Sequence, residues 1–79
     1  MSTQRIVALL NSQNPKKGDL SYRGEGACQA LVAMAGSITE GKAEISAAIV
    51  GFFQRFNQAT KDGEVTNRYG LEALAALQS

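Results

Sequence analysis

Apolar side chains recur at spacings of three and four through residues 42–60, which is the period of one face of an α-helix. The stripe consists of Ile45, Ala48, Ile49, Phe52, Phe56 and Ala59. Val50 and Phe53 fall on its flank, so the apolar surface is wider than a single neighbouring helix covers. The pattern therefore predicts a helix that is covered either by two helices of the same chain or by one helix and a partner.

Two further helices are predicted before this segment. The first spans about residues 3–13, with Ser2 as its N-cap and Pro15 just beyond its end. The second spans about residues 25–38 and is apolar nearly all round, which is typical of a helix buried on most sides. We expect this second helix to be the central element of the fold.

A fourth helix is predicted to begin near Thr66 or Asn67, after the break at Asp62-Gly63. The apolar segments are rich in alanine and do not alternate strictly, so strands are not expected. The predicted fold class is all-α, a bundle or orthogonal array of about four helices that forms one domain over residues 1–79.

Size leaves little margin for folding, because a 79-residue chain buries only about 60% of its unfolded surface. Cys28 is the single cysteine and histidine is absent, so neither a disulfide nor a metal site is expected to add stability. Unusually idealised packing and association with a second chain are the two remaining sources of stability. The lone cysteine and the absence of a long apolar segment favour a cytoplasmic protein with no membrane contact and no cofactor.

The connection between the first two helices, at about residues 11–26, is longer than the 2 to 8 residues usual in bundles. We expect Leu20 and Tyr22 to anchor it to the core. Three of the eight basic residues also lie here, namely Lys16, Lys17 and Arg23.

Two binding hypotheses concern this connection. Gly24 and Gly26 open the second predicted helix, where backbone amides favour a small anion or nucleotide, although Gln29 replaces the third glycine of a dinucleotide fingerprint. Alternatively, Tyr22 stacks on a base and the loop cations hold a nucleic-acid backbone. In both cases a solvated loop with packing glycines is the simpler interpretation. The candidate residues are Lys16, Lys17, Tyr22, Arg23, Gly24 and Gly26.

A helix-turn-helix unit also fits residues 28–50, with Gly36 in the turn. Its recognition helix would begin near Lys42, however, and Glu40 and Glu44 would repel DNA phosphates. A plain helical hairpin explains the pattern better.

Catalysis is not expected. Cys28 lies in an apolar run without a histidine to activate it, and Glu40 and Glu44 have no predicted cleft. No catalytic residue and no metal ligand is therefore assigned.

The function favoured by the sequence is protein interaction, as an adaptor, inhibitor or regulator of the kind found among phage and plasmid accessory proteins. Val50, Phe53 and Asn57 are the predicted partner-binding residues, and a homodimer is the expected assembly. Nucleic-acid binding, at the helix pair around Gly36 or at the basic loop, is the alternative, and binding of a small anion is the second alternative.

Overall fold

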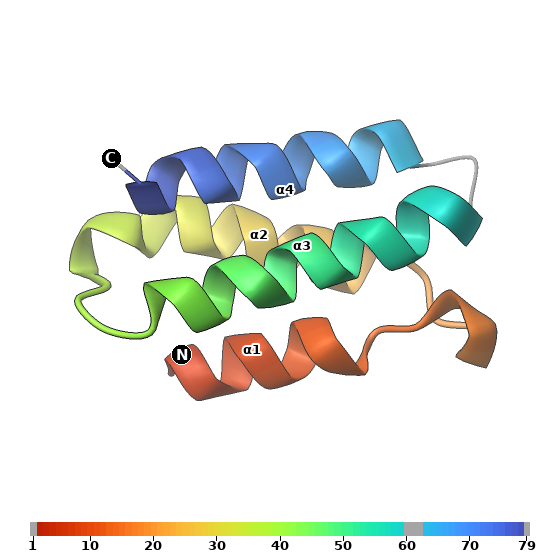
Figure 1. Cartoon of the computed structure of the whole chain (residues 1–79), viewed down its shortest axis with the longest axis horizontal. Coiled ribbons are helices and arrows are strands. Elements are labelled where there is room, and N and C mark those ends of the chain that lie inside the picture. Colours follow the sequence, from red (N-terminus) through yellow and green to blue (C-terminus); the bar gives the residue numbers. More distant parts are fainter. Residues whose placement is uncertain (1, 60–62, 79) are drawn as a thin grey trace.

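Four α-helices run up and down along one common axis (Figure 1). The computed structural model describes the backbone of residues 2–59 and 63–78, and the side chains of residues 2–56 and 68–78. The all-α fold class is confirmed, and the described residues contain no strand. The elements are α1 (Thr3–Ser12), a 3-10 turn η1 (Pro15–Lys17), α2 (Tyr22–Met34), a 3-10 turn η2 (Ala35–Ser37), α3 (Lys42–Ala59) and α4 (Gly63–Gln78).

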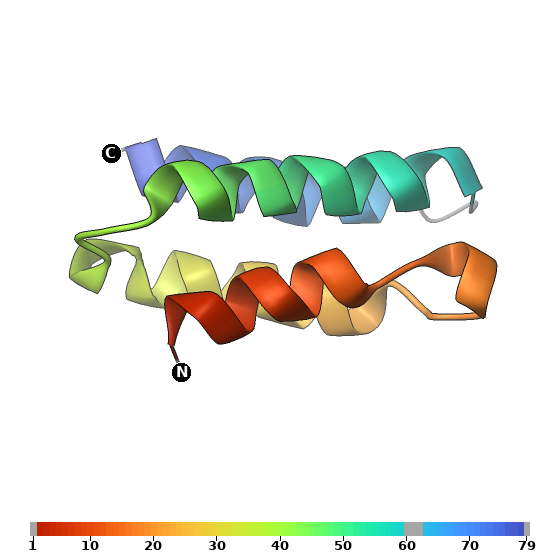
Figure 2. The same cartoon turned by 60° about the horizontal axis from the view of Figure 1, so that its bottom comes forward.

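The helices form two layers, with α1 beside α2 in one layer and α3 beside α4 in the other (Figure 2). Across the layers α1 packs on α3 and α2 packs on α4, so α2 and α3 lie diagonally although they follow each other in the chain. The expectation that α2 is central was wrong. Its outer side is open to solvent, where Val32 is 42% exposed and Ala33 is exposed as well.

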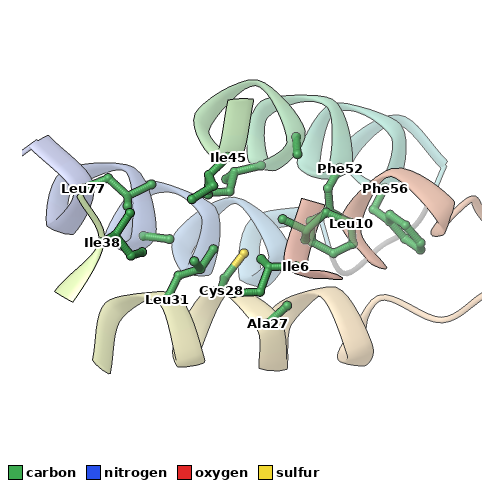
Figure 3. Packing of buried hydrophobic residues seen from close by; sticks show 13 residues of the cluster. Ile6, Leu10, Ala27, Cys28, Leu31, Ile38, Ile45, Phe52, Phe56 and Leu77 are labelled. Atoms are coloured by element: carbon green, nitrogen blue, oxygen red, sulfur yellow. The ribbon is translucent and has the colours of Figure 1, made fainter. Parts of the chain in front are cut away.

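All four helices contribute side chains to the hydrophobic core (Figure 3). The prediction that the apolar stripe of α3 is buried is confirmed for Ile45, Ala48, Ile49, Phe52 and Phe56. Two phenylalanines, Phe52 and Phe56, are fully buried, with ring centroids 5.0 Å apart. The side chain of Ala59, which we also placed in the stripe, lies outside the described residues. The remaining buried hydrophobic residues are Ile6, Leu10, Ala27, Cys28, Leu31, Ile38, Ala73 and Leu77.

The start of α1 is capped by a neighbouring residue, whereas its end is bound by a residue that is distant in the sequence. Ser2 caps the N-terminus, where its Oγ accepts a hydrogen bond from the backbone N–H of Arg5 at 3.3 Å, as predicted. At the C-terminus, the guanidinium of Arg55 donates to the carbonyl oxygens of Leu10 at 2.7 Å and of Gln13 at 2.9 Å. Arg55 therefore binds carbonyl groups at the end of the helix, where that of Leu10 also accepts from the N–H of Gln13 at 3.3 Å.

The connection between α1 and α2 is shorter than predicted, since it comprises residues 13–21. The cause is that α2 begins at Tyr22, three residues before the predicted start, and includes Gly24 within its helical backbone. The sequence pattern had predicted that Gly24 and Gly26 open this helix. α4 likewise begins at Gly63 rather than near Thr66.

None of the helices in the described part of the chain combines the length and the hydropathy of a membrane span.

Candidate functional site

Two parts of the surface carry exposed groups that the core does not explain. The first is the α3–α4 face, which we define by Val50, Phe53, Leu71 and Leu74. The second is the loop depression, which is built by the connection between α1 and α2.

On the α3–α4 face, the ring of Phe53 lies against Gly70 of α4. A Cβ atom on Gly70 would overlap the ring, with 3.1 Å to its Cε1 atom, so glycine is required for the two helices to approach this closely. Phe53 remains only half-buried, as does Val50 one turn earlier. The expected flank is thus partly covered by α4 and partly open.

Apolar residues that are not fully buried also follow Gly70 along α4. Leu74 lies one turn after Gly70 and is half-buried, whereas Leu71, three residues before Leu74, is 59% exposed. Exposed polar residues, Arg68 and Glu72, flank Leu71 along the helix. An apolar centre with a polar rim is the composition found at protein interfaces.

Sequence reasoning placed Val50, Phe53 and Asn57 on this face and missed its half on α4. Asn57 belongs to α3, but its side chain lies outside the described residues. The spacing of Leu71 and Leu74, combined with a glycine in mid-helix at Gly70, was the signal that could have found the missed half.

The loop depression is an open hollow of about 330 Å³. Two side chains hold the loop in shape. Asn14 Oδ1 accepts a hydrogen bond from the N–H of Lys16 at 3.0 Å, and the carboxylate of Asp19 accepts one from the N–H of Asn14 at 2.9 Å. Between them, Gly18 ends η1 with a φ of +85°, a conformation that favours glycine. The lining residues are Gln13, Gly18, Asp19, Leu20, Tyr22 and Arg23.

The prediction that Leu20 and Tyr22 anchor this loop to the core was wrong. Leu20 is 66% exposed and Tyr22 is 62% exposed, whereas Gln13 is buried, with an exposed fraction of 6%. Because the Arg55 side chain binds the carbonyl group of Gln13, the chain leaving α1 is held against α3 at Gln13 rather than at the later apolar residues.

The predicted cationic residues are exposed in or beside this loop, whereas neither predicted glycine lines the depression. Lys16 and Lys17 are exposed on η1, and Arg23 is exposed in the first turn of α2. Gly24 is buried within α2, and Gly26 is exposed further along the same helix. The prediction that these glycines open the helix was therefore wrong.

The helix pair around Gly36 does not have the geometry of a helix-turn-helix unit. Such units cross at about 90–120°, whereas α2 and α3 run almost antiparallel on opposite corners of the bundle (Figures 1 and 2). Glu40, Lys42 and Glu44 are all exposed near the start of α3, so positive and negative charges alternate there.

The thiol of Cys28 is fully buried, and its sulfur lies among core side chains (Figure 3). Burial raises the pKa of the Cys28 thiol to about 11, and the negative charge of Glu25 adds to the rise. The thiol is therefore protonated at neutral pH, which disfavours nucleophilic chemistry at this position.

Comparison of the chain with protein-family models, with curated proteins and with solved structures gives no match.

Proposed function

We propose that this protein is a helical interaction module that pairs with a second copy of itself through the α3–α4 face, and that it acts as a regulator or adaptor by occupying the surface of another macromolecule. The observation that carries the proposal is the exposure of Leu71, which directly follows Gly70, the residue of α4 that packs against the half-buried ring of Phe53. Aromatic and aliphatic side chains in this arrangement are the usual anchors of an interface.

The small net charge of the chain and the uncharged α3–α4 face favour a second copy of the chain as the partner. The formal net charge of the chain is +1, so two copies approach each other with little repulsion. The four residues that define the face are uncharged, and a two-fold axis through the face would place like apolar groups together. The polar rim of Arg68 and Glu72 carries one charge of each sign, which allows reciprocal contacts between the two copies.

The area required is also modest. A stable interface buries at least about 1,000 Å² in total, or about 500 Å² on each partner. The accessible surface of the chain is 4918 Å², so about a tenth of it would be covered. Pairing would also relieve the small folding margin of a 79-residue chain.

The proposal is tested by recording ¹⁵N–¹H spectra while the protein is diluted from about 1 mM to about 20 µM, a range that spans weak and moderate dimer affinities. We expect the amide signals of Val50, Phe53, Leu71 and Leu74 to move together with concentration. The amide signals of Val32, an exposed apolar residue on α2, serve as the control and should stay fixed. Unchanging spectra with the linewidths of an 8.4 kDa monomer, or changes centred on α2, would contradict pairing through the α3–α4 face.

A further inference from the structure

The side-chain amide of Gln13 is buried beside the loop depression without a hydrogen-bond partner among the described residues. Its backbone groups are satisfied, because its N–H donates to the carbonyl of Leu10 and its own carbonyl accepts from Arg55. An unpartnered buried amide costs about 1–3 kcal/mol and needs an explanation. A ligand in the depression would supply the missing donor and acceptor.

The segment that forms the depression carries a net positive charge. Residues 13–23 contain the cations Lys16, Lys17 and Arg23 and a single carboxylate, Asp19. Arg23 lines the depression and forms no ion pair with a described residue. One oxygen of Asp19 accepts from Asn14, and Glu25, the next acidic residue along the chain, accepts from the hydroxyl of Ser21 at 2.9 Å. The guanidinium of Arg23 is thus available to an anionic group such as phosphate.

The rim of the depression is aromatic and aliphatic. Tyr22 and Leu20, both more than half exposed, bury little apolar surface in the free chain. An exposed tyrosine ring is a stacking platform for a planar base. The hollow of about 330 Å³ is at the lower end of ligand sites, a size that suits one base.

We propose that the loop depression binds a single nucleotide unit whose base carries an amino group. The base would stack on Tyr22, the amide of Gln13 would pair with its hydrogen-bonding edge, and Arg23 would hold its phosphate. A glutamine amide reads adenine by accepting from the amino group and donating to the adjacent ring nitrogen. Asp19, which keeps one oxygen free of its bond to Asn14, accepts a second amino hydrogen. This site shares no residue with the α3–α4 face and does not depend on dimer formation.

The test is an NMR titration of the full chain with AMP. The expected result is a saturable shift of the Gln13 side-chain amide signals and of the backbone amides of Gly18 and Asp19, with a Kd of about 1 mM or tighter. UMP and adenosine should each bind at least about fivefold more weakly, because the first lacks the amino group and the second lacks the phosphate. Inorganic phosphate that binds as tightly as AMP, or no saturable shift up to about 10 mM AMP, would overturn the proposal.

Tyr22 and Arg23 are both exposed, so replacing either with alanine leaves the core unchanged. Tyr22→Ala and Arg23→Ala should each weaken AMP binding by about tenfold, whereas Arg5→Ala, which removes an exposed arginine of α1, should leave it unchanged. A short oligoadenylate identifies the source of the nucleotide unit. Tighter binding of the oligomer than of AMP indicates the end of a single strand, and equal binding indicates a free nucleotide. An unaltered affinity in both depression variants would refute the assignment.

Discussion

The ring of Phe52 occupies the space that a Cβ atom on Gly24 would need. Such an atom would lie 2.8 Å from Cδ1 of the ring and closer still to two further ring carbons. Gly24 belongs to α2 and Phe52 to α3, so the contact joins the two helices that lie diagonally in the bundle. The glycine therefore serves close packing, and it lies inside a helix where a glycine is otherwise unfavourable.

The substitution Gly24→Ala should lower the free energy of unfolding by about 1–3 kcal/mol, because the buried Phe52 ring must move to admit the new methyl group. Gly26→Ala is the matched control, since nothing lies within 4 Å of its Cβ position. The control should raise stability by about 0.5–1 kcal/mol through helix propensity. Urea unfolding followed by circular dichroism measures both. Equal stabilisation by the two alanines would show that Phe52 does not fill this space.

Arg55→Met should destabilise the protein by about 1.5–3 kcal/mol, because the charged hydrogen bonds to the carbonyl groups of Leu10 and Gln13 are lost together. Arg5→Met removes the same charge from an exposed site and should change stability by less than about 0.5 kcal/mol. Urea unfolding of the pair separates the effect of the bonds from that of charge. Similar midpoints for the two variants would mean that Arg55 does not hold the end of α1.

The free energy of unfolding should decrease as the pH rises into the alkaline range, because the thiol of Cys28 ionises more readily in the unfolded chain. Burial raises the pKa of the thiol from 9.0 to about 11, so between these values the folded chain keeps a proton that the unfolded chain releases. The contribution is complete below pH 9.0 and is lost as the pH rises towards about 11, by at most about 1.4 kcal/mol per pH unit.

The measurement for this prediction is the free energy of unfolding of the wild type and of Cys28→Ala from about pH 8 to about pH 10.5, a range that includes the thiol titration. Lysine and tyrosine titrations are common to both proteins, so the difference isolates the thiol. The advantage of the wild type over Cys28→Ala should shrink as the pH rises. A constant difference would be incompatible with a fully buried thiol.

The parts of the fold that depend on local chemistry were predictable. The Ser2 cap needs only a hydroxyl beside the first N–H groups of the helix, and the stripe from Ile45 to Phe56 needs only helical spacing. The start of α2 was not predictable in this way. A glycine either breaks a helix or allows close approach, and at Gly24 the choice depends on Phe52, which is 28 positions further along the chain.

The candidate sites show the same division. Val50 and Phe53 were identified from their place beside the stripe, but Leu71 joins them only because α4 packs on Phe53. Leu20 and Tyr22 were expected inside because of their apolar character. The hydrogen bond from Arg55 holds Gln13 against the core instead, and no short-range pattern reveals a contact between residues 42 positions apart.

The most direct test of the interaction hypothesis is sedimentation equilibrium at about 100 µM, a concentration at which a dimer with micromolar affinity is mostly formed. The wild type and Val32→Glu should sediment with about twice the monomer mass of 8.4 kDa, whereas Leu71→Glu should sediment as a folded monomer. A wild type that sediments at 8.4 kDa, or a Leu71→Glu variant that remains dimeric, would contradict pairing through the α3–α4 face.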